Sequence, residues 1–331
     1  MNNKMNMKKK HLFLYSLIAI FALVSCQKED IDEFIPDPTS GPDSTWYNFI
    51  DSSMPVNQLR SALLLDVVKD SFPVNSTTLF TAGSGLQFFL PPESISTLNN
   101  QPVTGNIQLE THLLRKKGHL IRMGTTTVSN GKLMVSDGTL FVRFSKNGNE
   151  LKVAQQKNIT IGFSSPSPSF QMRKFDGEAN SISAFNWLPN TDSMNNNVNI
   201  FNLQYQVKTN TLRWINCGYI YQNPGVPETT VSAILPFNYT NANSIAFTVF
   251  NDMQSVVGMY GNAGSRQFKT ERLPANSPVT VVVLSKQGND YFMGHVQATT
   301  TGVPGTVSNT AVTITPVITT LSNIISYLET L

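Results

Sequence analysis

Short runs in which apolar and polar residues alternate constrain the fold of this chain more than any other feature. The run from Leu86 to Leu90 alternates until Pro91-Pro92 stops it, and turn pairs such as Asn130-Gly131 and Asp137-Gly138 separate later runs. A period of two places the apolar side chains on one face of a β-strand. No helical pattern lies between these runs, which argues against a parallel sheet. The sequence therefore predicts a mostly β fold of antiparallel, sandwich-like sheets.

The alternating runs fall into two groups along the 331 residues. A chain of this length usually divides, because a single core stops growing at about 250–300 residues. A Ser-Pro stretch and an Asn-rich stretch interrupt the alternation between the two groups. We therefore expect two antiparallel β-sandwich-like domains, residues 58–165 and 198–303, joined by the connecting segment 166–197.

Residues 304–331 form a tail in which the last apolar residues recur at helical spacing. Thr315-Pro316 is a typical start, since proline fits the first position of a helix. We expect a short C-terminal helix that packs on one of the domains, with a helix that binds a partner as the alternative. The apolar stripe consists of Ile318, Leu321, Ile324, Ile325 and Leu328.

Residues 1–25 have the layout of a lipoprotein signal peptide. Lys8–Lys10 form a basic start, and the apolar run from Leu12 to Val24 is too short to span a bilayer. The run leads into Leu23-Val24-Ser25-Cys26, which resembles the bacterial lipobox, where the cysteine receives lipid and becomes the first mature residue. We therefore expect Cys26 to carry a lipid anchor. The alternative is an ordinary secretory leader followed by an unrelated cysteine.

Residues 26–57 are expected to form a flexible tether. Acidic residues, prolines and a glycine dominate the first part of this segment and leave little apolar surface to bury. Gln27, Lys28, Glu29 and Asp30 resemble the export signal that directs Bacteroidetes lipoproteins to the outer leaflet of the outer membrane. A merely solvated acidic linker is the alternative.

The net charge of +3 comes from the leader. The 24 Lys and Arg residues include four lysines before residue 25, which leaves 20 basic against 21 acidic residues in the mature chain. A chain with a charge near zero lacks the basic surface on which nucleic-acid binding depends. We therefore expect no nucleic-acid partner.

Few residues of the mature chain are suited to chemistry. Only Cys217 follows the anchor, so no intramolecular disulfide is expected, and its apolar surroundings predict a buried, unreactive thiol. His112 and His119 flank Arg115–Gly118, which we expect to be a loop, without acidic residues at metal-ligand spacing. No hydrolase, nucleotide-binding or metalloprotease motif occurs in the mature chain, and its acidic residues pair only by type. The sequence predicts no catalytic residue, no metal site and no cofactor.

Trp187 and Trp214 are the candidate ligand-contacting residues. An exposed aromatic ring has an apolar face that a sugar ring could cover. Trp214 lies in an apolar run and Trp187 lies between Phe185 and Leu188, so a place in the core is the interpretation that we favour.

Several segments resemble a widespread class of Bacteroidetes outer-membrane lipoproteins, over roughly residues 75 to 300. The first module is similar to the β-sandwich of ankyrins and netrin receptors, which serves protein contacts. The resemblance implies a β-sandwich protein of the cell envelope. The segments that carry it are Pro102–Glu110, Gly124–Leu133, Asn147–Leu151, Phe175–Gly177 with Asn186-Trp187, and Trp214–Cys217.

These features together predict a lipid-anchored cell-envelope protein that works as a non-catalytic binding or structural module. We expect it in the outer membrane, at the cell surface, held by lipid on Cys26 and facing an unknown protein or glycan ligand. The first alternative is a glycan-binding lipoprotein of a polysaccharide uptake system, and the second is an enzyme of unrecognised type.

The first prediction concerns the anchor. Cells fed a labelled fatty acid should label this protein, and Cys26→Ala should abolish the label because the thiol that accepts the lipid is gone. Cys217→Ala is the matched control and should leave the label intact. A labelled Cys26→Ala protein would contradict the assignment.

Overall fold

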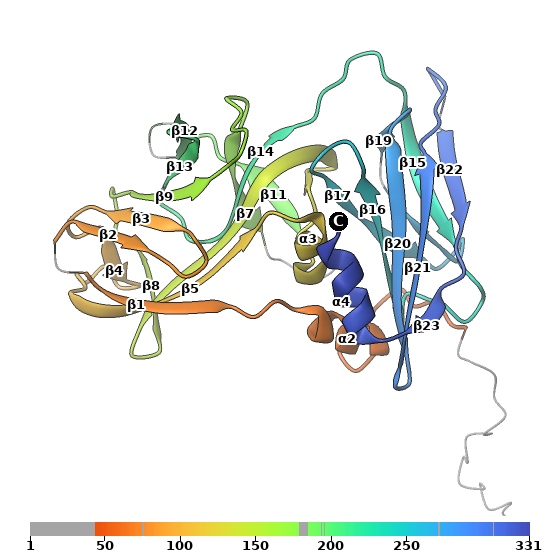
Figure 1. The fold of residues 1–331 in the computed structure, drawn as a ribbon, viewed down its shortest axis with the longest axis horizontal. Coiled ribbons are helices and arrows are strands. Elements are labelled where there is room, and N and C mark those ends of the chain that lie inside the picture. Colours follow the sequence, from red (N-terminus) through yellow and green to blue (C-terminus); the bar gives the residue numbers. More distant parts are fainter. Residues whose placement is uncertain are drawn as a thin grey trace, which may run out of the picture. The chain divides into compact units, whose positions relative to one another are not determined.

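The alternating runs form strands throughout the chain. The computed structural model describes residues 44–331 except 75, 179–184, 193, 195, 271 and 307. Of the described residues, 51% lie in strands and 9% in helices, and the strands form three sheets that are antiparallel apart from one strand pair. The mostly β, sandwich-like fold with a short C-terminal helix is thereby confirmed (Figure 1). The expected signal peptide and the first part of the expected tether lie outside the described residues.

The first sheet is organised around one long strand, β7. This strand pairs with β5 on one side and β14 on the other, and the order of the main path is β1-β5-β7-β14-β10-β11. The register of β14 on β7 shifts between Cys217 and Gly218, as at a β-bulge. The strands of this sheet are β1 (Val68–Val74), β4 (Ile95–Thr97), β5 (Gly105–Leu114), β6 (Val128–Ser129), β7 (Lys132–Lys146), β8 (Asn149–Val153), β10 (Arg173–Glu178), β11 (Asn186–Pro189) and β14 (Arg213–Ile220).

The second sheet has five strands in the order β12-β13-β9-β3-β2. Its inward side chains join those of the first sheet in one core, which contains Phe88, Phe144 and Phe163. This core between two sheets makes the first β region a sandwich. The strands of this sheet are β2 (Thr78–Thr81), β3 (Gln87–Leu90), β9 (Ile159–Ser164), β12 (Asn197–Phe201) and β13 (Gln204–Thr209).

The third sheet contains strands that are covered on both faces. Every residue of β16 is buried, because Ile245 and Phe247 pack toward helices while Ala246 and Phe250 pack into a separate core. This double burial explains why the sequence of β16 is apolar without alternation. The strands are β15 (Glu228–Ile234), β16 (Ser244–Phe250), β17 (Val256–Asn262), β18 (Gln267–Lys269), β19 (Leu273–Pro274), β20 (Pro278–Gln287), β21 (Asp290–Thr299), β22 (Ser308–Thr313) and β23 (Val317–Thr319), and β22 pairs in parallel with β15.

Three helices pack together against the third sheet: α2 (Pro55–Leu63), α3 (Lys117–Met123) and α4 (Leu321–Glu329). Residues Lys117 and Gly118, expected in a loop, belong instead to α3. Its Leu120 and Ile121 are buried, and this tertiary packing stabilises a helix too short to form alone.

The C-terminal helix begins later than Thr315-Pro316. Val317–Thr319 form strand β23, which suits β-branched residues, and the side chain of Thr320 caps the helix by accepting the N–H of Asn323 at 3.1 Å. Ile324 and Leu328 are fully buried, so the prediction that this helix packs on the folded chain is confirmed.

Hydrogen-bonded ladders cross the expected domain boundary. Strands β10 and β11 lie within the connecting segment 166–197, and β13 and β14, from the range 198–303, pair with β9 and β7. Residues 44–331 form one compact unit. Separate folding of 58–165 and 198–303 is not tested by these contacts and stays a prediction.

The second prediction concerns the contact between α3 and α4. A Cβ atom added at Gly118 would lie 1.8 Å from the carbonyl oxygen of Leu328, so Gly118→Ala should push α4 away. We expect a loss of about 1–3 kcal/mol in the free energy of unfolding, measured by urea titration, as for other overpacked positions. Gly264→Ala is the control, because a Cβ atom added there would lie no closer than 3.5 Å to a neighbouring atom, Asn262 Oδ1. Equal midpoints for the two variants would contradict the contact.

Candidate functional site

The two predicted tryptophans are packed against other side chains. Trp187 is fully buried, and its indole N–H donates to the carbonyl oxygen of Thr126 at 2.7 Å. Trp214 is half-buried, with its ring 5.0 Å from Phe141 and stacked on His112 at 6.3 Å. Trp187 therefore presents no face to a ligand and lies in the core, which is the interpretation that its sequence neighbours favoured. The predicted residues Cys26, Gln27, Lys28, Glu29 and Asp30 lie outside the described residues.

The residues with chemical potential are used in packing and pairing. Cys217 is fully buried, and burial with the nearby charge of Asp137 raises the pKa of its thiol, so the thiol stays protonated at neutral pH. His112 lies on β5 and burial lowers its pKa, whereas His119 lies on α3 and contacts Glu329. Within the described ranges, no group of three or more His, Cys, Asp and Glu side chains is placed to hold a metal ion. The helices among these residues include none that is long and apolar enough to cross a membrane.

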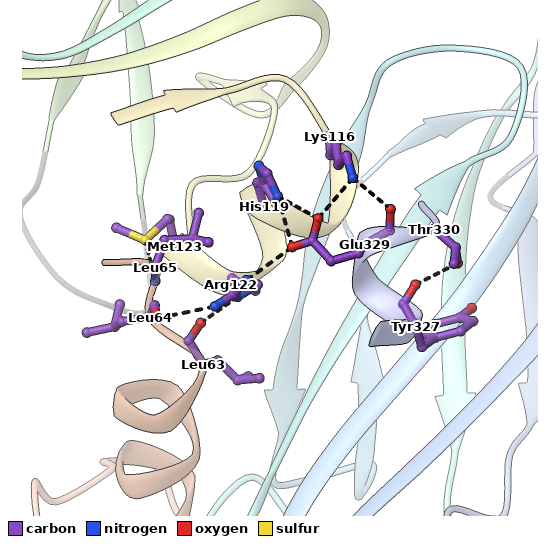
Figure 2. Close-up of polar contacts among 10 residues, drawn as sticks. All are labelled: Leu63, Leu64, Leu65, Lys116, His119, Arg122, Met123, Tyr327, Glu329 and Thr330. Atoms are coloured by element: carbon purple, nitrogen blue, oxygen red, sulfur yellow. Dashed lines mark hydrogen bonds and ion pairs between the residues drawn. The ribbon is translucent and has the colours of Figure 1, made fainter. Parts of the chain in front are cut away.

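Glu329 forms the densest charge cluster of the described chain (Figure 2). Its carboxylate, on α4, lies 2.9 Å from Lys116 Nζ, 3.0 Å from His119 Nε2 and 3.1 Å from Arg122 Nη1, which come from α3 and the residue before it. The hydrogen bond from Lys116 and the contacts with His119 lower the pKa of Glu329 to about 2. The carboxylate therefore stays ionised at physiological pH and links α4 to α3. Arg122 also links this charge cluster to α2, because it donates to the carbonyl oxygen of Leu63 at 2.8 Å.

A second charge pair is built into the edge of the first sheet. Lys174 has a fully buried side chain, and its Nζ lies 2.5 Å from Asp176 Oδ1 and 2.8 Å from Thr211 Oγ1. Burial lowers the pKa of Lys174 and opposes ionisation of Asp176, but the charge of Lys174 and the hydrogen bonds from Lys174, Thr211 and Asn190 lower the pKa of Asp176 overall. The carboxylate of Asp176 therefore has three side-chain partners, Lys174, Thr211 and Asn190. It fixes strand β10 rather than facing a cleft.

The outer face of the second sheet is open and is the candidate binding site. Alternate side chains of each strand point outward, and the strand registers align them in rows across the sheet. We call the middle one the central row. It contains one residue from each of the five strands, namely Thr81, Gln87, Gly162, Gln206 and Asn199.

Glycine at the middle of the central row leaves a depression in the sheet surface. The hollow has a volume of about 220 Å³, and Gly162 lines it together with Gln87 and Gln206, its partners on the two neighbouring strands. A Cβ atom at Gly162 would meet nothing closer than Gln87 Cβ at 3.5 Å, an ordinary contact. The backbone therefore does not require glycine here. Gly162 is itself buried beside the Gln87 side chain, whose Oε1 would lie 3.7 Å from a Cβ atom added here, so a ligand group would approach the sheet next to this amide.

The glutamine side chains around the depression have unused hydrogen-bonding capacity. In the part of the chain that the structure describes, the amides of Gln87, Gln204 and Gln206 make no hydrogen bond to another protein group. Each amide has two N–H donors and a carbonyl acceptor. These groups are available to a ligand on the open face.

The rows beside the central row carry apolar side chains. On one side, Leu79 and Phe89 face each other across strands β2 and β3, and their exposed fractions are 80% and 40%. On the other side, Phe201 lies opposite Gln204 and is 59% exposed. Polar groups flanked by exposed apolar ones are typical of binding surfaces.

No protein-family model matches the chain, and a search of curated proteins finds no match either. The resemblance to Bacteroidetes lipoproteins therefore remains an expectation from the sequence segments. The candidate site rests on the geometry of the open face.

The third prediction is a pH dependence. The pKa of Glu329 is below the ordinary 4.5 in the folded chain, so its contribution to stability is present above pH 4.5 and is lost as the pH falls toward about 2. Glu329→Gln should lower the free energy of unfolding at pH 7 by roughly 1 kcal/mol, because the carboxylate is 35% exposed and solvent screens its pairs.

The difference between wild type and Glu329→Gln should shrink as the pH is lowered from 4.5 to 2, measured by urea titration across that range. Glu228→Gln is the control, since Glu228 lies 3.6 Å from Arg272 and both side chains are well exposed. A constant difference at every pH would show that the carboxylate charge is not what holds α4.

Proposed function

We propose that this protein is a lipid-anchored cell-envelope protein that works as a non-catalytic binding module. The observation that carries the proposal is the open face of the second sheet, where glutamine amides without protein partners line a depression together with Gly162. The paired strands fix the backbone positions of these glutamines, so a ligand meets their amides at set intervals. The lipobox-like sequence at Cys26 supports the envelope location.

The position at which the tether joins the folded chain supports this arrangement. Arg266 donates a hydrogen bond to the carbonyl oxygen of Ser44 at 2.9 Å, and the ring of Trp46 lies 5.2 Å from that of Phe268. Asn241 fixes both the N–H and the carbonyl of Tyr47. These contacts lie beside the third sheet, whereas the candidate site lies on the second sheet, on the other side of Figure 1. The described chain therefore begins beside the third sheet rather than on the open face.

The alternative of a glycan-binding lipoprotein of a polysaccharide uptake system is favoured by one observation. Lys208 is the only charged residue in the five strands of the second sheet. A neutral face suits a neutral ligand, because charges steer and select charged partners.

The fourth prediction tests cell-surface display of the open face. Gln206→Cys should react with a membrane-impermeant maleimide on intact cells, because the side chain lies on the outward side of β13. Replacing Lys28, Glu29 and Asp30 by Ala in the same protein should abolish the reaction without affecting lipidation. The buried Cys217 gives little background in the protein without the introduced cysteine.

Gln297→Cys is the matched control, since Gln297 is exposed on β21 of the third sheet and should label in the same way. Equal labelling with and without the Lys28, Glu29 and Asp30 replacements would show that these residues are not an export signal. Labelling of neither position on intact cells would place the protein inside the outer membrane.

A further inference from the structure

We propose that the open face of the second sheet binds a neutral glycan chain that lies across the strands along the central row. This inference names the ligand class of the binding module and rests on the function proposed above. It is carried by three properties of the face: its charge, the spacing of its amides and the position of its exposed apolar side chains.

The charge of the face excludes most other ligand classes. Lys208 is the single charged residue on the five strands, and its Nζ donates to the carbonyl oxygen of Met194 at 2.8 Å. Nucleic acids and anionic polymers require several cations, and a cationic ligand requires acids that these strands lack. The ligand that fits is uncharged and rich in hydrogen-bonding groups.

The amides match hydroxyl groups in chemistry and in spacing. Gln87 and Gln206 lie in the same row, two strands apart, with Gly162 between them. Neighbouring strands are about 4.8 Å apart, so the central row places side chains at intervals close to the length of one pyranose ring. A hydroxyl group both donates and accepts, and so does a glutamine amide. One sugar ring over Gly162 would therefore meet an amide on each side.

The exposed apolar side chains supply the remaining contact. The C–H face of a sugar ring is apolar and packs on aromatic or aliphatic side chains. Phe89 and Leu79 offer such a surface on one side of the central row, and Phe201 offers another on the opposite side. One sheet thus offers partners both for the hydroxyl groups and for the C–H face of a sugar ring.

A protein partner fits the face less well. The centres of protein interfaces are enriched in Tyr, Trp and Arg. The central row instead consists of Thr, Gln, Gly and Asn, with its depression at the centre. A sugar ring over the depression would bring hydroxyl groups to the amides on both sides.

The fifth prediction tests this ligand class on the lipidated full chain in detergent. The probes are soluble neutral glucans, mannans and galactans of α and β linkage, with hyaluronan and polygalacturonate as charged counterparts. We expect retardation in affinity electrophoresis by at least one neutral polymer and by neither charged one. Retardation by the charged polymers alone, or by none of the probes, would overturn the proposal.

Gly162→Val separates binding from folding. Valine favours strands, and the space above Gly162 accepts a Cβ, so the midpoint of thermal unfolding should stay equal or rise. The same side chain fills the depression, so the neutral polymer should bind about tenfold more weakly or worse. Gln206→Ala should also weaken binding, and Gln297→Ala, an exposed glutamine on β21, should not. Unchanged binding by Gly162→Val would place the glycan elsewhere and overturn the proposal.

One further measurement separates two conclusions: that the ligand is not a glycan, and that the protein is not a binding module. The maleimide reaction of Gln206→Cys is repeated on purified protein with and without solubilised cell envelope. Protection of Gln206→Cys but not of Gln297→Cys, without neutral polymer binding, would retain the module and reject the glycan. Equal reaction rates in the absence of neutral polymer binding would reject both.

Discussion

Strand β7 is the physical link on which the rest of the structure depends. Its 15 residues run for about 50 Å, and its side chains enter different cores along its length. Leu133 packs with the third sheet, while Leu140 and Phe144 pack inside the sandwich. The bulge where Gly218 of β14 faces Ser136 lies between these two halves. One strand therefore couples two cores, and the ladder to β14 runs past the boundary that composition suggests.

Local sequence predicted the elements better than their partners. The alternation from Leu86 to Leu90 gave a strand because the period of side-chain burial is visible within one segment. The pairing of β13 with β9 could not be seen, since strand order depends on contacts between residues far apart in the chain. Helix α3 was missed because its stability comes from burial of Leu120 and Ile121 against other elements rather than from its own residues. Helix α4 begins later than predicted, because the capping hydrogen bond of the Thr320 side chain outweighs the preference of Pro316 for a first helical turn.

The candidate site shows the same limit. The sequence of each strand indicates which residues point outward, such as Gln204 and Gln206 on β13. It does not reveal that Gln87, Gly162 and Gln206 share a row, because that row exists only after β3, β9 and β13 pair in register. Attention to tryptophan pointed instead to Trp187, which the core uses. The signal that the sequence does carry is a set of neutral amides at outward strand positions, together with a glycine within a neighbouring strand.

The helix α4 has a consequence for the order in which the chain reaches its final state. Its last turn supplies both the Leu328 carbonyl that covers Gly118 and the Glu329 carboxylate that gathers Lys116, His119 and Arg122. Before α4 has been synthesised, α2 and α3 can pack on the third sheet but lack the cover at Gly118 and the counter-charge of Glu329. Because α4 follows every strand of the three sheets in the sequence, its synthesis sets the earliest moment at which the helical cluster can be fully folded.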